Sequence, residues 1–160
     1  MTGKPLPYFK SPIRLPAGAS YWRPPAAATL KLIWSLEVAG PGVLWAGTAP
    51  GGLFRSADGG QSWELMRGLW DRPERSHWFG GGYDYPAIHS ICRDPRSSKT
   101  IRLALSSGGV WLTQDDGATW ELVGDGLHYD EGFPPEDRGK LDTQDVHQMK
   151  QCRSSPDHLW

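Results

Sequence analysis

The feature that most constrains the fold of this 160-residue chain is an eight-residue motif that occurs twice. The copies span residues 56–63 and 113–120 and read SADGGQSW and TQDDGATW. Both follow the pattern hydroxyl-x-Asp-x-Gly-x-hydroxyl-Trp, and two unrelated segments rarely agree at every fixed position. The chain therefore contains an internal repeat, which is typical of folds built from stacked copies of one unit.

The residue types of the motif predict a tight turn between two strands. The carboxylate accepts N–H groups inside the turn, the glycine supplies a positive φ, and the second hydroxyl caps further backbone groups. The tryptophan begins the next strand with a large apolar ring. The motif is thus predicted to be scaffold rather than a ligand site. Its structural residues are Ser56, Asp58, Gly60, Ser62 and Trp63 in the first copy, and Thr113, Asp115, Gly117, Thr119 and Trp120 in the second.

This pattern resembles the Asp box, or bacterial neuraminidase repeat, of sialidase-like and sortilin-like β-propellers. The segments GLFRS at 52–56 and GVWLT at 109–113 resemble the strand that precedes the box in that family. The resemblance covers roughly residues 31 to 160. It implies an all-β fold of four-stranded antiparallel blades, in which the box joins the third and fourth strands and lies away from the ligand.

Strand-like periodicity supports two such units. The predicted strands are 32–38, 43–47, 52–55 and 62–66 in the first unit, 87–93, 100–106, 110–113 and 119–123 in the second, and 146–152 at the start of a third. Since a propeller closes with about four or more blades, we expect a fragment of a larger propeller or a homo-oligomer that closes the ring.

The predicted organisation follows from these units. Six prolines and the absence of a regular period in the first 30 residues predict an extended lead-in. The segments are a Pro-rich lead-in at 1–30, a blade at 31–68, an aromatic glycine-rich loop at 69–86, a blade at 87–123, an acidic loop at 124–145 and an incomplete blade at 146–160.

Two long loops carry aromatic side chains beside carboxylates. They join the last strand of one blade to the first strand of the next, so both lie at the end of the sheets opposite the boxes. Flat rings and carboxylates suit carbohydrate, because a sugar face stacks on a ring while its hydroxyls form hydrogen bonds. The alternative is that the rings form local cores over the blades. The ligand-binding candidates in these loops are Trp78, Tyr83, Asp84 and Tyr129.

Two histidines occupy equivalent positions in the repeat. His89 and His147 are each second in an innermost strand, where the first unit has Trp34. Imidazoles that line the central channel could bind a metal or an anionic ligand. Alternatively, each histidine is a channel-wall residue bonded to backbone or water. No third metal ligand is visible in the sequence, so we predict no metal and no cofactor.

The composition argues against two classes of partner, nucleic acids and membranes. The formal net charge is −1, and no run of lysine or arginine forms a basic stripe, so neither a nucleic-acid nor a membrane partner is predicted. The sequence shows neither a membrane-length apolar stretch nor a secretory signal, which predicts a cytoplasmic protein. The remaining partners are carbohydrate and protein.

Three functions are compatible with these observations. The first is a scaffold that binds a ligand or a protein. The second is a glycoside hydrolase, sialidase-like or of the inverting two-carboxylate type, with further catalytic residues on other blades. The resemblance implies several sialidase site residues. Arg14 is the candidate for the first substrate-binding arginine, although it could instead belong to a Pro-rich tail, and segment 45–50 lacks the expected aspartate. The third is an assembly factor for a protein complex. No catalytic residue is predicted from the sequence.

Overall fold

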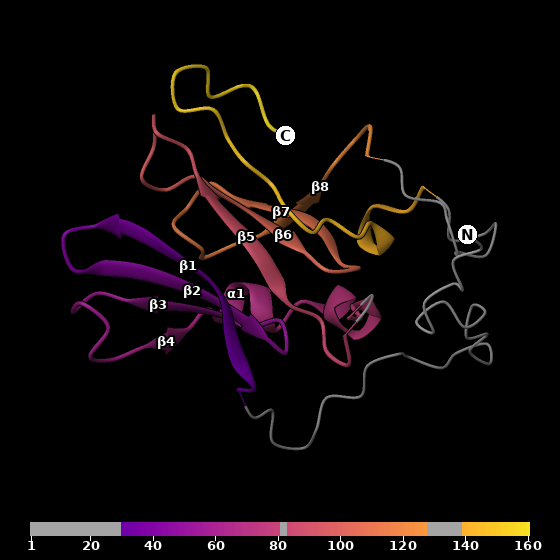
Figure 1. Cartoon of the computed structure of the whole chain (residues 1–160), viewed down its shortest axis with the longest axis horizontal. Helices are drawn as coiled ribbons and strands as arrows, with labels where there is room; N and C mark the ends of the chain where they lie inside the picture. Colours follow the sequence, from indigo (N-terminus) through magenta and orange to yellow (C-terminus); the bar gives the residue numbers. More distant parts are fainter. Residues whose placement is uncertain (1–29, 81–82, 128–138) are drawn as a thin grey trace, which may run out of the picture.

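The computed structural model describes residues 30–80, 83–127 and 139–160. These residues form two four-stranded antiparallel sheets and very little helix (Figure 1). In each sheet every strand pairs with the next one along the chain. The all-β prediction is confirmed, but no closed ring of sheets is present among the described residues. The strands are β1 (Leu32–Gly40), β2 (Val43–Ala49), β3 (Leu53–Ser56) and β4 (Glu64–Leu65) in the first sheet, and β5 (Ile88–Arg93), β6 (Ile101–Leu105), β7 (Gly109–Thr113) and β8 (Glu121–Val123) in the second.

The predicted strand at 146–152 is wrong in its extent. One isolated bridge joins Gln151 to Leu159, and the backbones of Lys150 and Trp160 exchange two hydrogen bonds of 2.8 and 2.9 Å. A two-stranded hairpin has few cross-strand partners, so its pairing is confined to a short stretch. The carboxy-terminal segment is therefore a hairpin that lies beside β5 (Figure 1).

The connections that follow the sheets contain three short helical turns, which the sequence did not predict. They are α1 (Arg67–Trp70), η1 (Pro73–His77) and η2 (Leu141–Thr143). Pro73 opens η1, where its fixed φ suits the first helical position and its missing N–H leaves no bond unmade. In the described part of the chain, no helix is long and apolar enough to cross a bilayer.

The two aspartate turns, residues 56–63 and 113–120, have the same hydrogen bonds. In the first, Asp58 accepts the Ser62 N–H at 2.9 Å and the Ser62 hydroxyl at 2.6 Å, and the Ser56 hydroxyl accepts the Gly60 N–H at 2.8 Å. The second turn repeats these bonds at 2.9, 2.6 and 3.0 Å. The glycine φ angles are +92° and +89°. In both turns the two hydroxyls donate to the carboxylate, and the first hydroxyl also caps the backbone, which corrects the predicted role of the second.

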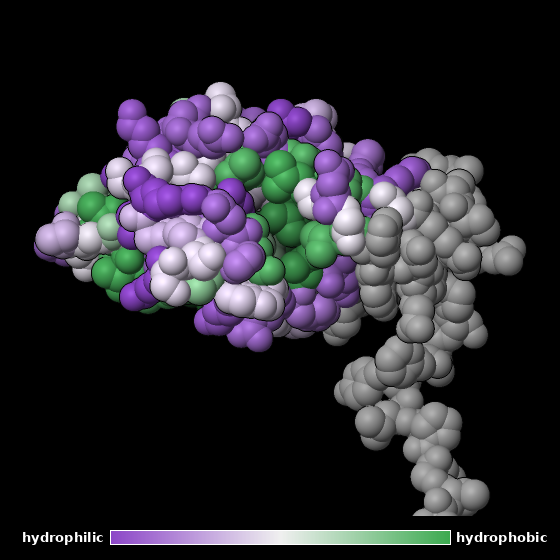
Figure 2. Space-filling model, turned by 90° about the horizontal axis from the view of Figure 1, so that it is seen from above, coloured by the Kyte–Doolittle hydropathy of each residue, from purple (hydrophilic) through white to green (hydrophobic). Residues whose placement is uncertain are grey.

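The sheets pack face to face around an apolar core. The first sheet contributes Trp45 and Leu53, and the second contributes Ile88, Leu103 and Trp111. Some apolar residues nevertheless stay at the surface, and Figure 2 shows a hollowed apolar area bordered by hydrophilic residues on one face of the molecule. The packing of the two sheets therefore leaves part of the apolar surface uncovered.

A second, smaller contact holds the carboxy-terminal segment against the second sheet. Met149 is buried in a cluster with Cys92, Ala104 and Val110. Its N–H donates to the Ser90 hydroxyl at 3.0 Å, and the Cys92 thiol donates to its carbonyl at 3.2 Å. Apolar burial and two hydrogen bonds between side chains of β5 and the backbone of Met149 thus fix this segment on the outer face of the second sheet.

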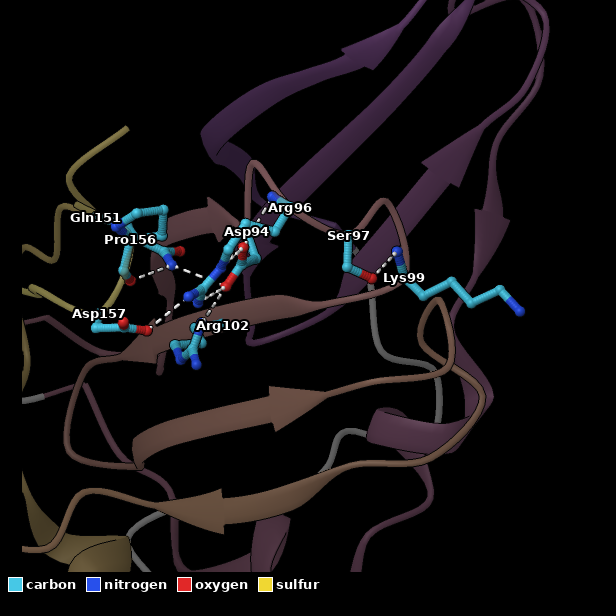
Figure 3. Close-up of polar contacts among 8 residues, drawn as sticks. All are labelled: Asp94, Arg96, Ser97, Lys99, Arg102, Gln151, Pro156 and Asp157. Atoms are coloured by element: carbon cyan, nitrogen blue, oxygen red, sulfur yellow. Dashed lines mark hydrogen bonds and ion pairs between the residues drawn. The ribbon is translucent and has the colours of Figure 1, made fainter. Parts of the chain in front are cut away.

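A polar network supports the same contact at the other end of the segment (Figure 3). The guanidinium of Arg96 donates to Asp94 and to Asp157, each at 2.7 Å. The amide of Gln151 also donates to Asp94, at 3.1 Å. Hydrogen bonds from Arg96, the largest cause, hold the pKa of Asp94 well below its usual value. This carboxylate stays charged and joins the turn after β5 to the carboxy-terminal hairpin.

Candidate functional site

β1 and β5 contain a bulge at the same point of the repeat. The extra residue is Trp34 in β1 and His89 in β5. A bulge leaves one residue out of the ladder and changes the direction of its side chain. The two rings stack with centroids 4.8 Å apart and planes 3° apart. One local irregularity, present in both sheets, thus brings these side chains together.

The stack continues on both sides. Tyr83 lies next to Trp34, with ring centroids 5.8 Å apart and planes tilted by 56°. On the other side, the ring of His147 meets that of His89 at 4.9 Å and 63°. We call these four side chains the ring strip. Three segments that are distant in the sequence contribute to it, namely the start of β1, the connection into β5 with β5 itself, and the carboxy-terminal segment.

A carboxylate orients the last member of the strip. Asp145 lies 3.1 Å from Nε2 of His147 and accepts the Ser107 N–H at 3.2 Å. Since a carboxylate only accepts, Nε2 of His147 carries the proton. Ser107 is buried and has a φ of +37°, which is strained for a residue with a side chain. Such strain persists where surrounding contacts enforce it, and here it aims an N–H at Asp145.

The protonation of His89 follows from its partner. Its Nδ1 lies 3.3 Å from the carbonyl oxygen of His147, so Nδ1 carries a proton and donates. Burial is the first cause that lowers the pKa of His89, and the neighbouring charge of His147 is the second. The neutral ring then keeps Nε2 as an acceptor for a ligand hydroxyl or N–H.

Three of the predicted ligand residues, Tyr83, His89 and His147, are brought together in the ring strip. Trp78 is elsewhere, because it is fully buried in the core and meets Trp111 edge to face at 5.6 Å. Asp84 is exposed, in the connection that carries Tyr83.

The candidate Tyr129 lies outside the described residues. Sequence reasoning did not select Trp34 or Asp145 as ligand residues. The alignment of the repeats was the available signal for Trp34, since it matches this residue with the two histidines. No comparable signal exists for Asp145, because its role depends on a turn in the neighbouring sheet.

Three side chains of the ring strip, those of Trp34, Tyr83 and His147, are exposed. A cavity of about 30 Å³ lies at Leu30, Thr48, Pro50, Phe54 and Trp70, and it has room for about one water molecule. A sugar ring does not fit there. Within residues 30–80, 83–127 and 139–160, no three metal-ligating side chains come together. The exposed strip is therefore the stronger candidate site.

Comparison with known proteins relates the chain to one carbohydrate enzyme. No family model matches the sequence. The chain is 35% identical over 98 residues to a protein of Emericella nidulans named oligoxyloglucan-reducing end-specific xyloglucanase. The matching region covers 58% of this chain and 11% of that protein. The chain thus spans a small part of the relative's length and has a glycoside hydrolase as a distant homologue.

Proposed function

We propose that this chain forms part of a carbohydrate-binding β-propeller and that the ring strip is its sugar contact. The observation that carries the proposal is the run of four neighbouring rings, of which Trp34 and Tyr83 are exposed. Aromatic faces bind the C–H face of a pyranose, and an exposed row of such rings suits an extended glycan better than a small compact ligand. The xyloglucanase relative supports the same ligand class.

Polar groups at the strip can form hydrogen bonds with the hydroxyls of a sugar. His89 offers a ring nitrogen as acceptor, and Asp145 and His147 form a charged or polar pair beside it. A sugar hydroxyl both donates and accepts, so it pairs with either kind of group. Stacking then provides affinity, while the imidazoles and the carboxylate select among hydroxyl patterns.

The propeller scaffold is supported by the repeat. Both sheets have the same strand order, the same bulge in the first strand and the same aspartate turn between the third and fourth strands. In this proposal each sheet is one blade, the turns are Asp boxes, and the strip faces the central channel. Further blades from the same or another chain would complete the site.

A second candidate, glycoside hydrolysis, is favoured by the name of the relative alone. An inverting hydrolase needs two carboxyl groups on opposite sides of the bond that breaks. Asp145 is bonded to His147, and Asp142 lies 3.1 Å from Nδ1 of His77. Either aspartate could supply one of the two groups, and the partner would come from outside the described residues.

Calorimetric titration of the 160-residue chain with oligoxyloglucans tests the proposal. We expect binding, about tenfold weaker affinity in Trp34→Ala, and unchanged affinity in Trp63→Ala, an exposed tryptophan in an aspartate turn at the other end of the sheet. Malto-oligosaccharides serve as the unrelated glycan. An absence of binding, or equal loss in both variants, would contradict the proposal, and release of new reducing ends in the same samples would favour the hydrolase.

A further inference from the structure

The same sheet face is covered in one repeat and open in the other. Ile33, Leu36 and Trp63 of the first sheet are 55%, 59% and 37% exposed. Their counterparts in the second sheet, Ile88, Ile91 and Trp120, are 0%, 8% and 5% exposed, because the first sheet packs on them. We call the surface formed by Ile33, Leu36 and Trp63 the β1 face. It has the apolar character of an interface but no cover from the described residues.

Trp160, in the carboxy-terminal hairpin, is equivalent to Trp45, the tryptophan of the first sheet that packs on the second. Trp45 of β2 is 1% exposed and belongs to the core between the two sheets. In the carboxy-terminal hairpin, Trp160 pairs with Lys150 just as Trp45 pairs with Glu37. Trp160 is 70% exposed. It therefore occupies the position from which Trp45 packs against the following sheet.

Other residues of the hairpin also occupy positions equivalent to those of β1 and β5. His147 meets His89 and Met149 packs on the second sheet as Ile91 packs on the first, so Gln148 takes the place of Ser35. The hydroxyl of Ser35 donates to the carbonyl of Ile88 at 2.8 Å and fixes the contact between the sheets. The amide of Gln148, which is exposed, also has a donor for such a carbonyl.

We propose that copies of this chain associate head to tail, with Trp160 of one copy packed on the β1 face of the next. The occupant of the face is a second copy, because the chain itself carries the complementary surface and already makes this contact once internally. A buried tryptophan is the residue type that most often dominates an interface. The contact joins two different surfaces, so each added copy leaves one of each free, and assembly continues until a ring closes or a filament forms.

Sedimentation velocity over a hundredfold range of concentration tests this association. We expect the wild-type chain to grow from monomer into species larger than a dimer. Leu36→Asp places a carboxylate on the β1 face, and Trp160→Ala removes the anchor, so each variant alone should stay monomeric. Leu127→Asp, at a leucine that is 39% exposed and lies outside both surfaces, is the matched control and should assemble like wild type.

Mixing the two monomeric variants separates this arrangement from a symmetric one. Leu36→Asp keeps its Trp160 and Trp160→Ala keeps its β1 face, so the mixture should form a one-to-one dimer and nothing larger. A wild-type chain that stays monomeric throughout would overturn the proposal. So would Trp160→Ala chains that still dimerise on their own, because that result would mean that two β1 faces meet. Circular dichroism of each variant checks that the sheets are intact.

Discussion

The two sheets of this protein share their local structure and differ in what covers them. Trp63 and Trp120 illustrate this, since each indole N–H donates to the glycine carbonyl of its own turn, at 3.1 and 3.0 Å. Trp63 is nevertheless exposed and Trp120 buried. The turn thus forms from bonds within eight residues, whereas burial of the ring depends on the neighbouring sheet. The hydrogen bonds of the turn therefore form whether or not another sheet packs on its tryptophan.

The residues at the contact surfaces of the two sheets differ more than the residues of the two turns. Trp45 and Gly47 lie on the face of the first sheet that packs on the second, and the equivalent positions of the second sheet hold Arg102 and Ala104. The absence of a side chain at Gly47 allows a close approach, because the Ser35 hydroxyl and the side chain of Ile88 occupy the space that a Cβ would need. The contact between the two sheets is therefore closer there than a contact built on alanine allows.

The largest effect should come from shortening one isoleucine of the repeat. Ile88→Ala should lower the free energy of unfolding by about 2–5 kcal/mol, because it leaves a cavity at a fully buried position. Ile33→Ala, at the equivalent exposed position, should cost about 0.5 kcal/mol or less in the monomer. Urea denaturation at a concentration that keeps the chain monomeric measures both. Equal losses would show that the β1 face is covered in solution.

How much of this could be read from the sequence depends on the range of the interactions. The turns and the eight strands were predictable, because a motif such as that around Asp58 contains its own donors and acceptors and strand periodicity is local. The helical turns α1, η1 and η2 were not predicted, because the long loops lack a sustained period. The extent of the carboxy-terminal strand was overestimated, because pairing requires neighbours that the described chain does not supply.

The candidate site divides in the same way. Alignment of the repeats matched His89 with His147, and in the structure the two rings are in contact. Aromatic content alone could not separate Tyr83, which reaches the strip, from Trp78, which fills the core. That distinction depends on the packing between sheets. The role of Asp145 could not be predicted from the sequence for the same reason, because the strained turn at Ser107 in the second sheet orients this carboxylate.

A smaller effect is expected at the close contact between the sheets. In Gly47→Ala the new Cβ would lie 2.6 Å from Cγ2 of Ile88, so the sheets must move apart, at a cost of about 1–3 kcal/mol. The reverse change at the equivalent position, Ala104→Gly, removes one methyl group and should cost about 1 kcal/mol. Thermal unfolding of both variants compares the interfaces. A Gly47→Ala variant as stable as wild type would mean that the sheets do not pack this closely.

The smallest effect concerns the stability of the fold at low pH. It tests whether the two turns are equally stable although only one of them is covered by a neighbouring sheet. Hydrogen bonds from Ser62 hold the pKa of Asp58 well below its ordinary value, and those from Thr119, the largest cause, lower the pKa of Asp115 to about 2 from 3.8. A carboxyl whose pKa is lower in the folded state stabilises the fold above about pH 4 and loses that contribution as the pH falls toward 2.

Asp58→Asn and Asp115→Asn should therefore each reduce stability at pH 7 and flatten its decline between pH 4 and 2. Because both turns make the same bonds, the two variants should behave alike even though the neighbouring tryptophans differ in burial. Urea midpoints at pH 7, 4 and 2 provide the measurement, with Asp125→Asn, at an exposed aspartate outside both turns, as the control. A loss confined to Asp115→Asn would mean that the sheet contact, rather than the turn itself, maintains this hydrogen-bond pattern.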